Sequence, residues 1–458
     1  MLNFVDRWEI AVPNNLTKRL LIAALAALFY SIPAPTCGQA LALDHLSDLS
    51  QEKQGLTRDD QLAARLNKVI DKAIEQKQIV GTVVVVAQDG RVVYKRAAGF
   101  ADRETKRAMK QDSIFQLASM TKTIVSAAAL KLIEEKKLKL DDPVTKYLPD
   151  FKPKLADGSS PDILISQLLS HTSGLGYGFA EKKDGPYHKA KVSDGLDQPG
   201  LSMVENMRRL SSVPLLCQPG SKWCYSLSID VLGAVLEKAA NQSLPEIVRN
   251  KVTAPLAMTD TDFSLAKGNR SRLVTAYFDN PARQQQKEKA LDSANSSIEP
   301  LRMQALQLVA FDGGCFSFAP ARLFNLDSYP SGGAGISGTA EDYLKLIEAI
   351  RTKDKNMLSS DSYKLMTNSQ IGKLSISPGG DWGFTYGSAV LLNAKPEKGP
   401  HNAGTLQWGG AYGHHWFIDP DEKLSVVELT NTTVEGMSGA FSKDIAKAVY
   451  GSNHGSYQ

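Results

Sequence analysis

The sequence has few of the features that would assign it to a membrane, a metal site or a nucleic acid. Its longest apolar run, residues 20–32, is shorter than the roughly 20 residues that a membrane-spanning helix needs. The net charge is only +4, and no block of Lys and Arg concentrates it, so nothing indicates a nucleic-acid partner. CxxC, HExxH and GxSxG motifs are absent, and so are repeats and low-complexity tracts. What remains is the composition of an ordinary globular protein, 42% hydrophobic and 22% charged.

The N-terminal segment has the pattern of a secretory signal. Lys18 and Arg19 precede the apolar run "LLIAALAALFYSI", and small residues follow in "PTCGQALA". We therefore predict that residues 1–42 are a signal peptide, that the mature chain begins near Leu41 or Leu43, and that the protein is periplasmic or secreted. An uncleaved N-terminal anchor is the alternative. After cleavage we expect no stable membrane partner.

The four cysteines and the paired histidines permit only limited conclusions. Cys217 and Cys224 bracket a loop with Pro-Gly; in an oxidising compartment they could form a disulfide, and two unpaired thiols are equally compatible with the spacing. Cys37 falls in the predicted signal, which leaves Cys315 without a partner. His414 and His415 are adjacent and would point to opposite faces of a strand, so we predict no metal site.

Hydrophobic periodicity outlines an α+β fold with two lobes. Residues 60–79 form an amphipathic helical stripe, and two β-branched runs joined by Asp89-Gly90 indicate a hairpin. Helical patterns dominate 119–252, strand patterns return only near the end in "FTYGSAVLL", "GTLQWGG", "YGHHWFID" and "LSVVELTN", and a helix closes the chain at 436–449. We predict an antiparallel sheet lobe from residues 43–118 and 330–458 and a mostly helical lobe from 119–329, with a pocket between them. The polar run 281–300 is expected to be a loop or flap.

A serine and a lysine stand one helical turn apart at the start of an apolar segment. Ser119 and Lys122 can meet on one helix face, but the same S-x-x-K spacing also occurs at 50–53 and 264–267, in polar surroundings. Only the pair at 119–122 is followed by a segment, "TIVSAAAL", that is apolar or small on all sides. Burial favours the neutral amine, and a neutral amine beside a hydroxyl is a base next to a nucleophile. A capping serine with a lysine that reaches the surface is the structural alternative.

Further motifs give the sequence a family resemblance from about residue 60 to 450. The chain resembles the serine β-lactamase and penicillin-binding-protein superfamily, class C branch, in six segments that occur in the order typical of that branch: "SMTK", "ISQLLSHTSGL" at 165–175, the segment 218–244, "APLAMTDTDF" at 254–263, "GGAGISGTAEDYLKL" at 332–346 and "WGGAYGHHWFIDP" at 408–420. The resemblance implies a β-lactamase/transpeptidase-like fold. It also implies Ser119 as nucleophile, Lys122 as base, Tyr225 as a proton carrier, and an oxyanion hole made by the backbone N–H groups of Ser119 and Ala411.

Two positions depart from the usual pattern of that superfamily. "YSL" replaces Tyr-x-Asn and "WGG" replaces Lys-Thr-Gly, so Leu227 occupies the position of an amide side chain and Trp408 the position of a cation. Those groups would bind an acylamino side chain and a substrate carboxylate, and their loss argues against peptide stems and penicillins. "WGG" is similar to the third motif of the family VIII carboxylesterases. We expect Trp408, Gly409, Gly410 and Leu227 to contact substrate, with sheet packing as the alternative role of Trp408.

The sequence thus predicts a serine hydrolase that cleaves small esters with short acyl chains through an acyl-enzyme and needs no cofactor. A β-lactamase or D-alanyl-D-alanine carboxypeptidase is one alternative, and acyl transfer to an alcohol or amine is another. The alternative of a different class is a binding protein for cell-wall fragments or acylating ligands with little turnover.

Overall fold

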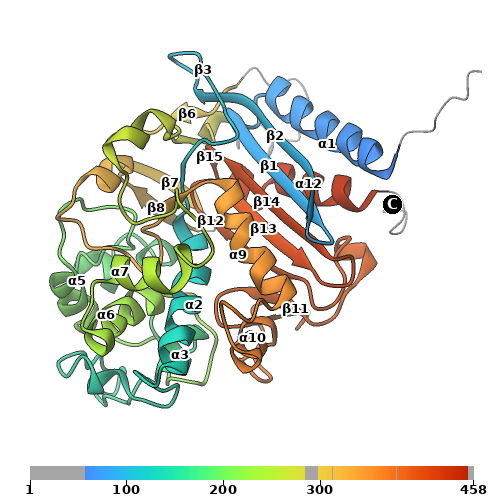
Figure 1. The fold of residues 1–458 in the computed structure, drawn as a ribbon. Helices are drawn as coiled ribbons and strands as arrows, with labels where there is room; N and C mark the ends of the chain where they lie inside the picture. Colours follow the sequence, from blue (N-terminus) through green and yellow to red (C-terminus); the bar gives the residue numbers. More distant parts are fainter. Residues whose placement is uncertain (1–56, 284–297, 312, 378, 452–458) are drawn as a thin grey trace, which may run out of the picture. The chain divides into compact units, whose positions relative to one another are not determined.

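The central element of the fold is an antiparallel sheet to which both ends of the chain contribute. The computed structural model describes residues 57–283, 298–311, 313–377 and 379–451. Its eight-stranded sheet has the order β10-β11-β12-β13-β14-β1-β2-β3. The strands are β1 Gly81–Gln88, β2 Arg91–Asp102, β3 Arg107–Ala108, β10 Trp382–Phe384, β11 Ala389–Leu391, β12 Leu406–Gly410, β13 His414–Asp419 and β14 Leu424–Thr430. The predicted sheet from both chain ends is confirmed (Figure 1).

The first hairpin follows directly from its turn residues. β1 and β2 pair antiparallel, and Asp89 and Gly90 between them have φ values of 53° and 81°. A two-residue turn with positive φ at both positions matches the twist of the flanking strands, and Asp-Gly tolerates it well. β1 then pairs with β14 in a register that places Val84 opposite Glu428.

Helices cover both faces of the sheet because the side chains of β1 alternate between two apolar clusters. Val84 and Val86 pack with α1 (Arg58–Glu75) and α12 (Ala440–Tyr450), whereas Val83 and Val85 share a cluster with α9 (Ala340–Thr352). A strand that is buried on both faces has apolar residues at successive positions of its sequence, which explains "TVVVVA". Helix α1 begins two residues earlier than the predicted stripe and ends four earlier. The predicted terminal helix is divided into α11 (Glu435–Ser438) and α12.

Helices supply the regular secondary structure between residues 119 and 252, where helical patterns were predicted, and loops connect them. These helices are α2 Thr121–Glu134, α3 Ile165–Leu169, α4 Pro186–Lys189, α5 Met203–Ser211, α6 Ser228–Ala240 and α7 Leu244–Val248. They gather beside the sheet in Figure 1, with α2 in contact with α6 and α7. Every residue of α2 from Thr121 to Leu130 is buried, which a helix of small and apolar side chains on all sides permits. The exact lobe boundaries at 118/119 and 329/330 stay a prediction.

The expectation that strands return only near the end was wrong. A hairpin of β7 (Gln307–Phe311) and β8 (Gly314–Phe318) precedes them, and two further small sheets join β15 (Thr432–Thr433) with β5 (Tyr277–Phe278) and β6 (Leu301–Arg302), and β4 (Phe115–Gln116) with β9 (Ser337–Gly338). Most of these strands have two residues, too few for an alternating pattern to be recognised. The run "FTYGSAVLL" is also not one strand, because a turn closed by Thr385 and Ser388 separates β10 from β11.

Several sequence predictions concern residues outside the described ranges. The signal peptide at 1–42, Cys37 and most of the polar run 281–300 lie there. In the described part of the chain, no helix has both the length and the apolarity needed to cross a bilayer. Cys217, Cys224 and Cys315 are free thiols in the structure. Burial, followed by the neighbouring Cys217, raises the pKa of Cys224 to about 11.

Candidate active site

Ser119 lies on a strained turn immediately before the buried helix α2. The turn spans Ala118–Met120, and Ala118 has a φ of 46°. A non-glycine residue in this left-handed region costs roughly 1–2 kcal/mol. Neighbouring hydrogen bonds hold the turn in place: the Leu117 N–H donates to the Ile336 carbonyl at 2.8 Å, and the Ile336 N–H donates to Thr121 Oγ1 at 3.1 Å. The segment after β4 is therefore fixed from the outside, which allows it to keep the strained residue.

Lys122 meets Ser119 as the spacing predicted. Its Nζ lies 3.2 Å from Ser119 Oγ and donates a 2.8 Å hydrogen bond to the carbonyl of Gly333. The lysine side chain is 1% exposed, and its Nζ sits 4.7 Å from the ring centroid of Tyr225. Because the amine is buried, neutral and aromatic groups surround it in place of water. The alternative of a lysine that reaches the surface is thereby excluded.

A buried carboxylate organises the carbonyl that Lys122 uses. Asp230, on the first turn of α6, accepts a 2.6 Å hydrogen bond from Ser331 Oγ. Burial raises the pKa of Asp230 to about 6, while the Ser331 bond and the charge of Lys122 act in the opposite direction. Asp230 thus holds Ser331, two residues before the Gly333 carbonyl that accepts from the lysine. The sequence analysis missed it, although a lone carboxylate in "SIDVLGAVL" was a usable signal.

Tyr225 presents an unbonded phenol beside the serine and lysine. Its hydroxyl is buried without a hydrogen-bond partner among the described residues, so it can form a hydrogen bond to a ligand. The ring lies 4.8 Å from that of His171 and 5.3 Å from that of Trp408. Burial, and then the charge of Lys122, lower the pKa of His171 well below its usual value, so this imidazole is neutral and serves as packing.

The strand β12 approaches the serine turn closely enough to align an amide. A Cβ at Gly410 would lie 2.3 Å from the Leu117 carbonyl oxygen, so only glycine permits the contact. The Gly410 carbonyl accepts a 2.9 Å bond from the Gly413 N–H. Because a trans peptide places N–H and C=O on opposite sides, this bond also fixes the direction of the Ala411 N–H, the predicted oxyanion donor. Ser119 and Ala411 both line the same cavity.

That cavity has a volume of about 400 Å³ and a largely aromatic wall. Ser119, Tyr225, Trp408, Gly409 and Ala411, all predicted as site residues, line it. Side chains that the sequence analysis missed line it as well: Phe179, Phe311, Phe316, Ile376, Trp382 and Met437. No Lys, Arg, Asp or Glu is among the described lining residues. Burial lowers the pKa of His415, a further lining residue, to about 3, so it adds no charge at neutral pH.

Trp408 is both a cavity wall and a packing residue, so the two roles considered for it coexist. Its ring lies 5.2 Å from that of Phe384, edge to face, and it is partly buried against the main core. Leu227 differs from the expectation: it is fully buried in the same core and does not line the cavity. It precedes the first residue of α6, where an apolar side chain turns into the protein interior. Gly410 also contributes no lining surface, and its role is the close approach to Leu117.

Two of the four missed aromatic residues come from the β7–β8 hairpin. Phe311 and Phe316 lie on its two strands, and Phe316 contacts Phe179 at 4.4 Å between ring centroids. The letters "FDGGCFSF" contain an Asp-Gly turn signal between aromatic residues that could have identified the hairpin. Among the described residues, no group of three or more His, Cys, Asp or Glu side chains could hold a metal ion.

Comparisons with known proteins agree with the fold described above. The family model described as "Beta-lactamase" matches residues 66–449. Esterase EstB of Burkholderia gladioli is 44% identical over 85% of this chain and 95% of its own. Lovastatin esterase of Penicillium rubens is 27% identical over 78% of this chain and 90% of its own.

Solved structures give the same result at the level of the fold. EstCE1, described as a hydrolase with promiscuous acyltransferase activity, superposes with a TM-score of 0.78 at 41% identity, covering 86% of this chain and 99% of that one. Simvastatin synthase (LovD) from Aspergillus terreus superposes with a TM-score of 0.65 at 21% identity, covering 85% and 98%. The second match supports the fold alone.

Proposed function

The chain belongs to the beta-lactamase family, and from this premise we propose that it is a serine hydrolase that cleaves carboxylic esters with short acyl chains through an acyl-enzyme. Two relatives, 44% and 41% identical to this chain, are described as an esterase and as a hydrolase with promiscuous acyltransferase activity. Both cover most of this chain, so the likeness extends over the sheet, the helical region and the cavity.

The proposed reaction uses the groups that meet at Ser119. Ser119 Oγ attacks the ester carbonyl carbon while its proton passes to Lys122 Nζ, 3.2 Å away. The N–H groups of Ser119 and Ala411 stabilise the oxyanion of the tetrahedral intermediate. When the C–O bond to the alcohol breaks, Lys122 and the Tyr225 phenol return a proton to the leaving oxygen. Water then attacks the acyl-serine by the same route and releases the acid.

One observation favours an uncharged ester over a β-lactam or a peptide stem. The described wall of the cavity carries no cation, and aromatic and apolar side chains surround the serine. A substrate carboxylate would lose its hydration there without a charged partner in exchange. An ester with an apolar acyl or alcohol part would instead bury its hydrocarbon against Trp408 and Phe316. The binding-protein alternative is less well supported, because Ser119 lines the cavity and the amine of Lys122 lies 3.2 Å from its hydroxyl.

The substrate preference can be measured with two chromogenic compounds. We expect kcat/KM for p-nitrophenyl butyrate to exceed that for a chromogenic cephalosporin by about 100-fold or more. In enzymes with the usual motifs, a cation and an amide would together stabilise the cephalosporin transition state by about 3 kcal/mol, and this chain lacks both groups. Equal turnover, or better turnover of the cephalosporin, would reverse the ranking and favour a β-lactamase.

A pair of variants at one position tests the stated cause of this preference. Trp408→Phe retains an aromatic wall and should keep ester turnover within a few-fold of wild type. Trp408→Lys restores the cation of the usual motif and should shift the ratio toward the cephalosporin by about tenfold, the value of one charge-assisted hydrogen bond. An unchanged ratio in Trp408→Lys would show that the cavity charge does not set the preference.

We also propose that the protein is exported, on the strength of the signal-like pattern of residues 1–42. Mass spectrometry of the protein purified from the periplasm or medium should give an N-terminus near Leu41 or Leu43. A purified exported form that still carries residues 1–40 would contradict signal cleavage and favour an uncleaved anchor.

A further inference from the structure

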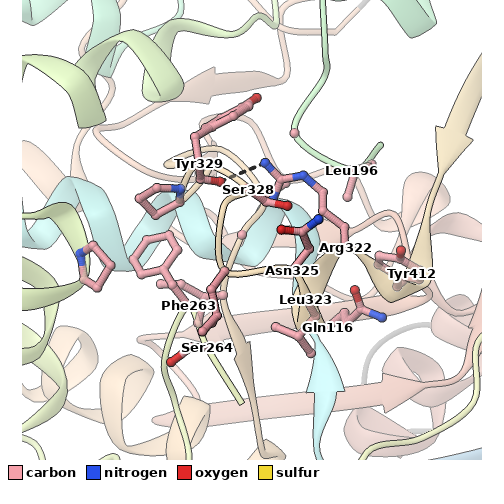
Figure 2. A pocket seen from close by; sticks show the side chains of 17 residues that line it. Gln116, Leu196, Phe263, Ser264, Arg322, Leu323, Asn325, Ser328, Tyr329 and Tyr412 are labelled. Atoms are coloured by element: carbon pink, nitrogen blue, oxygen red, sulfur yellow. Dashed lines mark hydrogen bonds between the residues drawn. The ribbon is translucent and has the colours of Figure 1, made fainter. Parts of the chain in front are cut away.

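A second cavity, whose lining residues differ from those of the cavity at Ser119, has a buried guanidinium group in its wall. Its volume is about 210 Å³, and Arg322 is among its lining residues (Figure 2). None of its described lining residues also lines the cavity at Ser119. Arg322 lies in the turn Pro320–Phe324, which follows β8, and is only 8% exposed. A guanidinium buried to this degree normally has a carboxylate partner.

The partners of Arg322 are neutral and leave one nitrogen unused. Nε donates to the Asp197 carbonyl at 3.0 Å, and Nη2 donates to the Tyr329 carbonyl at 2.8 Å, the bond drawn in Figure 2. The guanidinium carbon also lies 4.6 Å from the centroid of the Tyr329 ring. Within the described residues, Nη1 has no hydrogen-bond partner and Arg322 forms no ion pair. The backbone bonds hold the planar group rigidly, with donor capacity to spare.

Other polar groups converge on the same space. Tyr412 lines the cavity, and its buried hydroxyl has no hydrogen-bond partner among the described residues. The side chains of Gln116 and Asn325 lie around the pocket in Figure 2 and supply amide groups. A buried, unbonded hydroxyl and a guanidinium nitrogen with no hydrogen-bond partner among the described residues are what an anion with two oxygens would satisfy.

Two buried carboxylates, Asp197 and Asp230, interact with the charge of Arg322, but neither forms an ion pair with it among the described residues. Burial raises the pKa of Asp197, while hydrogen bonds from Ser193 and Ser317 and the charge of Arg322 oppose that effect. Its carboxylate is engaged by Ser193 Oγ at 2.6 Å and does not reach the guanidinium to form an ion pair. The positive charge at the cavity is therefore available to a ligand.

Apolar side chains make up much of the remaining cavity wall, and the volume of the cavity limits the size of the ligand. Leu196, Phe263, Leu323 and Ile336 line it together with Pro245. A cavity of about 150 Å³ lined by such side chains already holds a benzene ring. A volume of about 210 Å³ therefore accommodates a phenyl ring or short alkyl chain together with a carboxylate.

We propose that this cavity is a binding site for a small monocarboxylate with an apolar tail, whose oxygens bind Arg322 Nη1 and the Tyr412 hydroxyl. The site shares structural elements with the catalytic centre. Ala334, Gly335 and Ile336 follow the Gly333 carbonyl that binds Lys122, and Tyr412 follows the oxyanion residue Ala411. The inference does not depend on the proposed esterase activity, because it concerns a separate cavity and is tested by binding.

The test compares a charged ligand with its neutral isostere on the unmodified protein. In isothermal titration calorimetry, phenylacetate should bind one site per chain, and phenylacetamide should bind at least tenfold more weakly, since it lacks the charge that pairs with Arg322. Equal affinity for the two compounds, or no saturable binding of phenylacetate, would overturn the proposal. Preferential binding of inorganic phosphate would overturn the assignment to a monocarboxylate.

Two variants locate the binding and separate it from the catalytic cavity. Ser264 is exposed and lines only the second cavity, so Ser264→Trp should fill its opening without disturbing the core and reduce phenylacetate affinity at least tenfold. Arg322→Gln should have the same effect where it folds. Arg91→Gln, an exposed arginine on β2, is the matched control and should bind as wild type does. Binding that persists in Ser264→Trp would place the acid elsewhere and refute the site.

Discussion

Ser119→Ala and Lys122→Met are each expected to lower kcat/KM for p-nitrophenyl butyrate by about 10⁴-fold or more, and the double variant should be no worse than either. The two groups lie 3.2 Å apart and act on one proton, so removing either abolishes the same step. Methionine has the length of lysine without its amine and should pack in the same buried space. Initial rates with the chromogenic ester measure all three variants.

The control for this prediction lies in the same sequence. Lys267 ends a second S-x-x-K pattern but is exposed, so Lys267→Met should retain wild-type turnover. If Lys122→Met kept more than a tenth of wild-type activity, lysine would not be the base. If the fold-decrease in kcat/KM of the double variant equalled the product of the two single-variant decreases, the serine and lysine would act independently.

Gly410→Ala is expected to lower kcat by about 10²–10³-fold, the loss that follows removal of one oxyanion donor. The new Cβ would lie 2.3 Å from the Leu117 carbonyl oxygen. Both atoms belong to the backbone or are fixed to it, so β12 must move away from the turn that carries Ser119. The Ala411 N–H then moves with the strand, while KM should change far less than kcat.

The neighbouring glycine provides a matched comparison. A Cβ at Gly409 would lie 2.9 Å from the His414 carbonyl oxygen and 3.0 Å from Met437 Cγ, and the latter belongs to a flexible side chain. We therefore expect Gly409→Ala to lose less activity than Gly410→Ala at similar thermal stability. Similar kcat values for Gly410→Ala and wild type would show that the close approach of β12 does not position the oxyanion donor.

Local sequence was sufficient for the features that depend on spacing and on continuous patterns. The sheet built from both ends, the Asp89-Gly90 hairpin and the buried helix after Ser119 all follow from periods of 2 or 3.6 residues and from turn chemistry. The meeting of Ser119 and Lys122 follows in the same way, because one helical turn brings the two side chains together.

Features that depend on contacts between residues distant in the chain could not be predicted from these local patterns. The Gly333 carbonyl that binds Lys122 lies 211 residues away from it, and Asp230 acts on that carbonyl from a third segment. The aromatic wall from Phe311 and Phe316 comes from a hairpin that the sequence analysis did not identify, and Leu227 turned into the core although the motif placed it at the site.

The sequence alone therefore determined the sheet, the nucleophile with its base, and the replacement of a cation by Trp408, because each depends on near neighbours or on a single position. Only the tertiary structure decided how the lysine is held, which side chains line the cavity at Ser119, and that the buried Arg322 lines a second cavity. Those features arise from packing between segments hundreds of residues apart, where burial and shape, and not local periodicity, determine which groups meet.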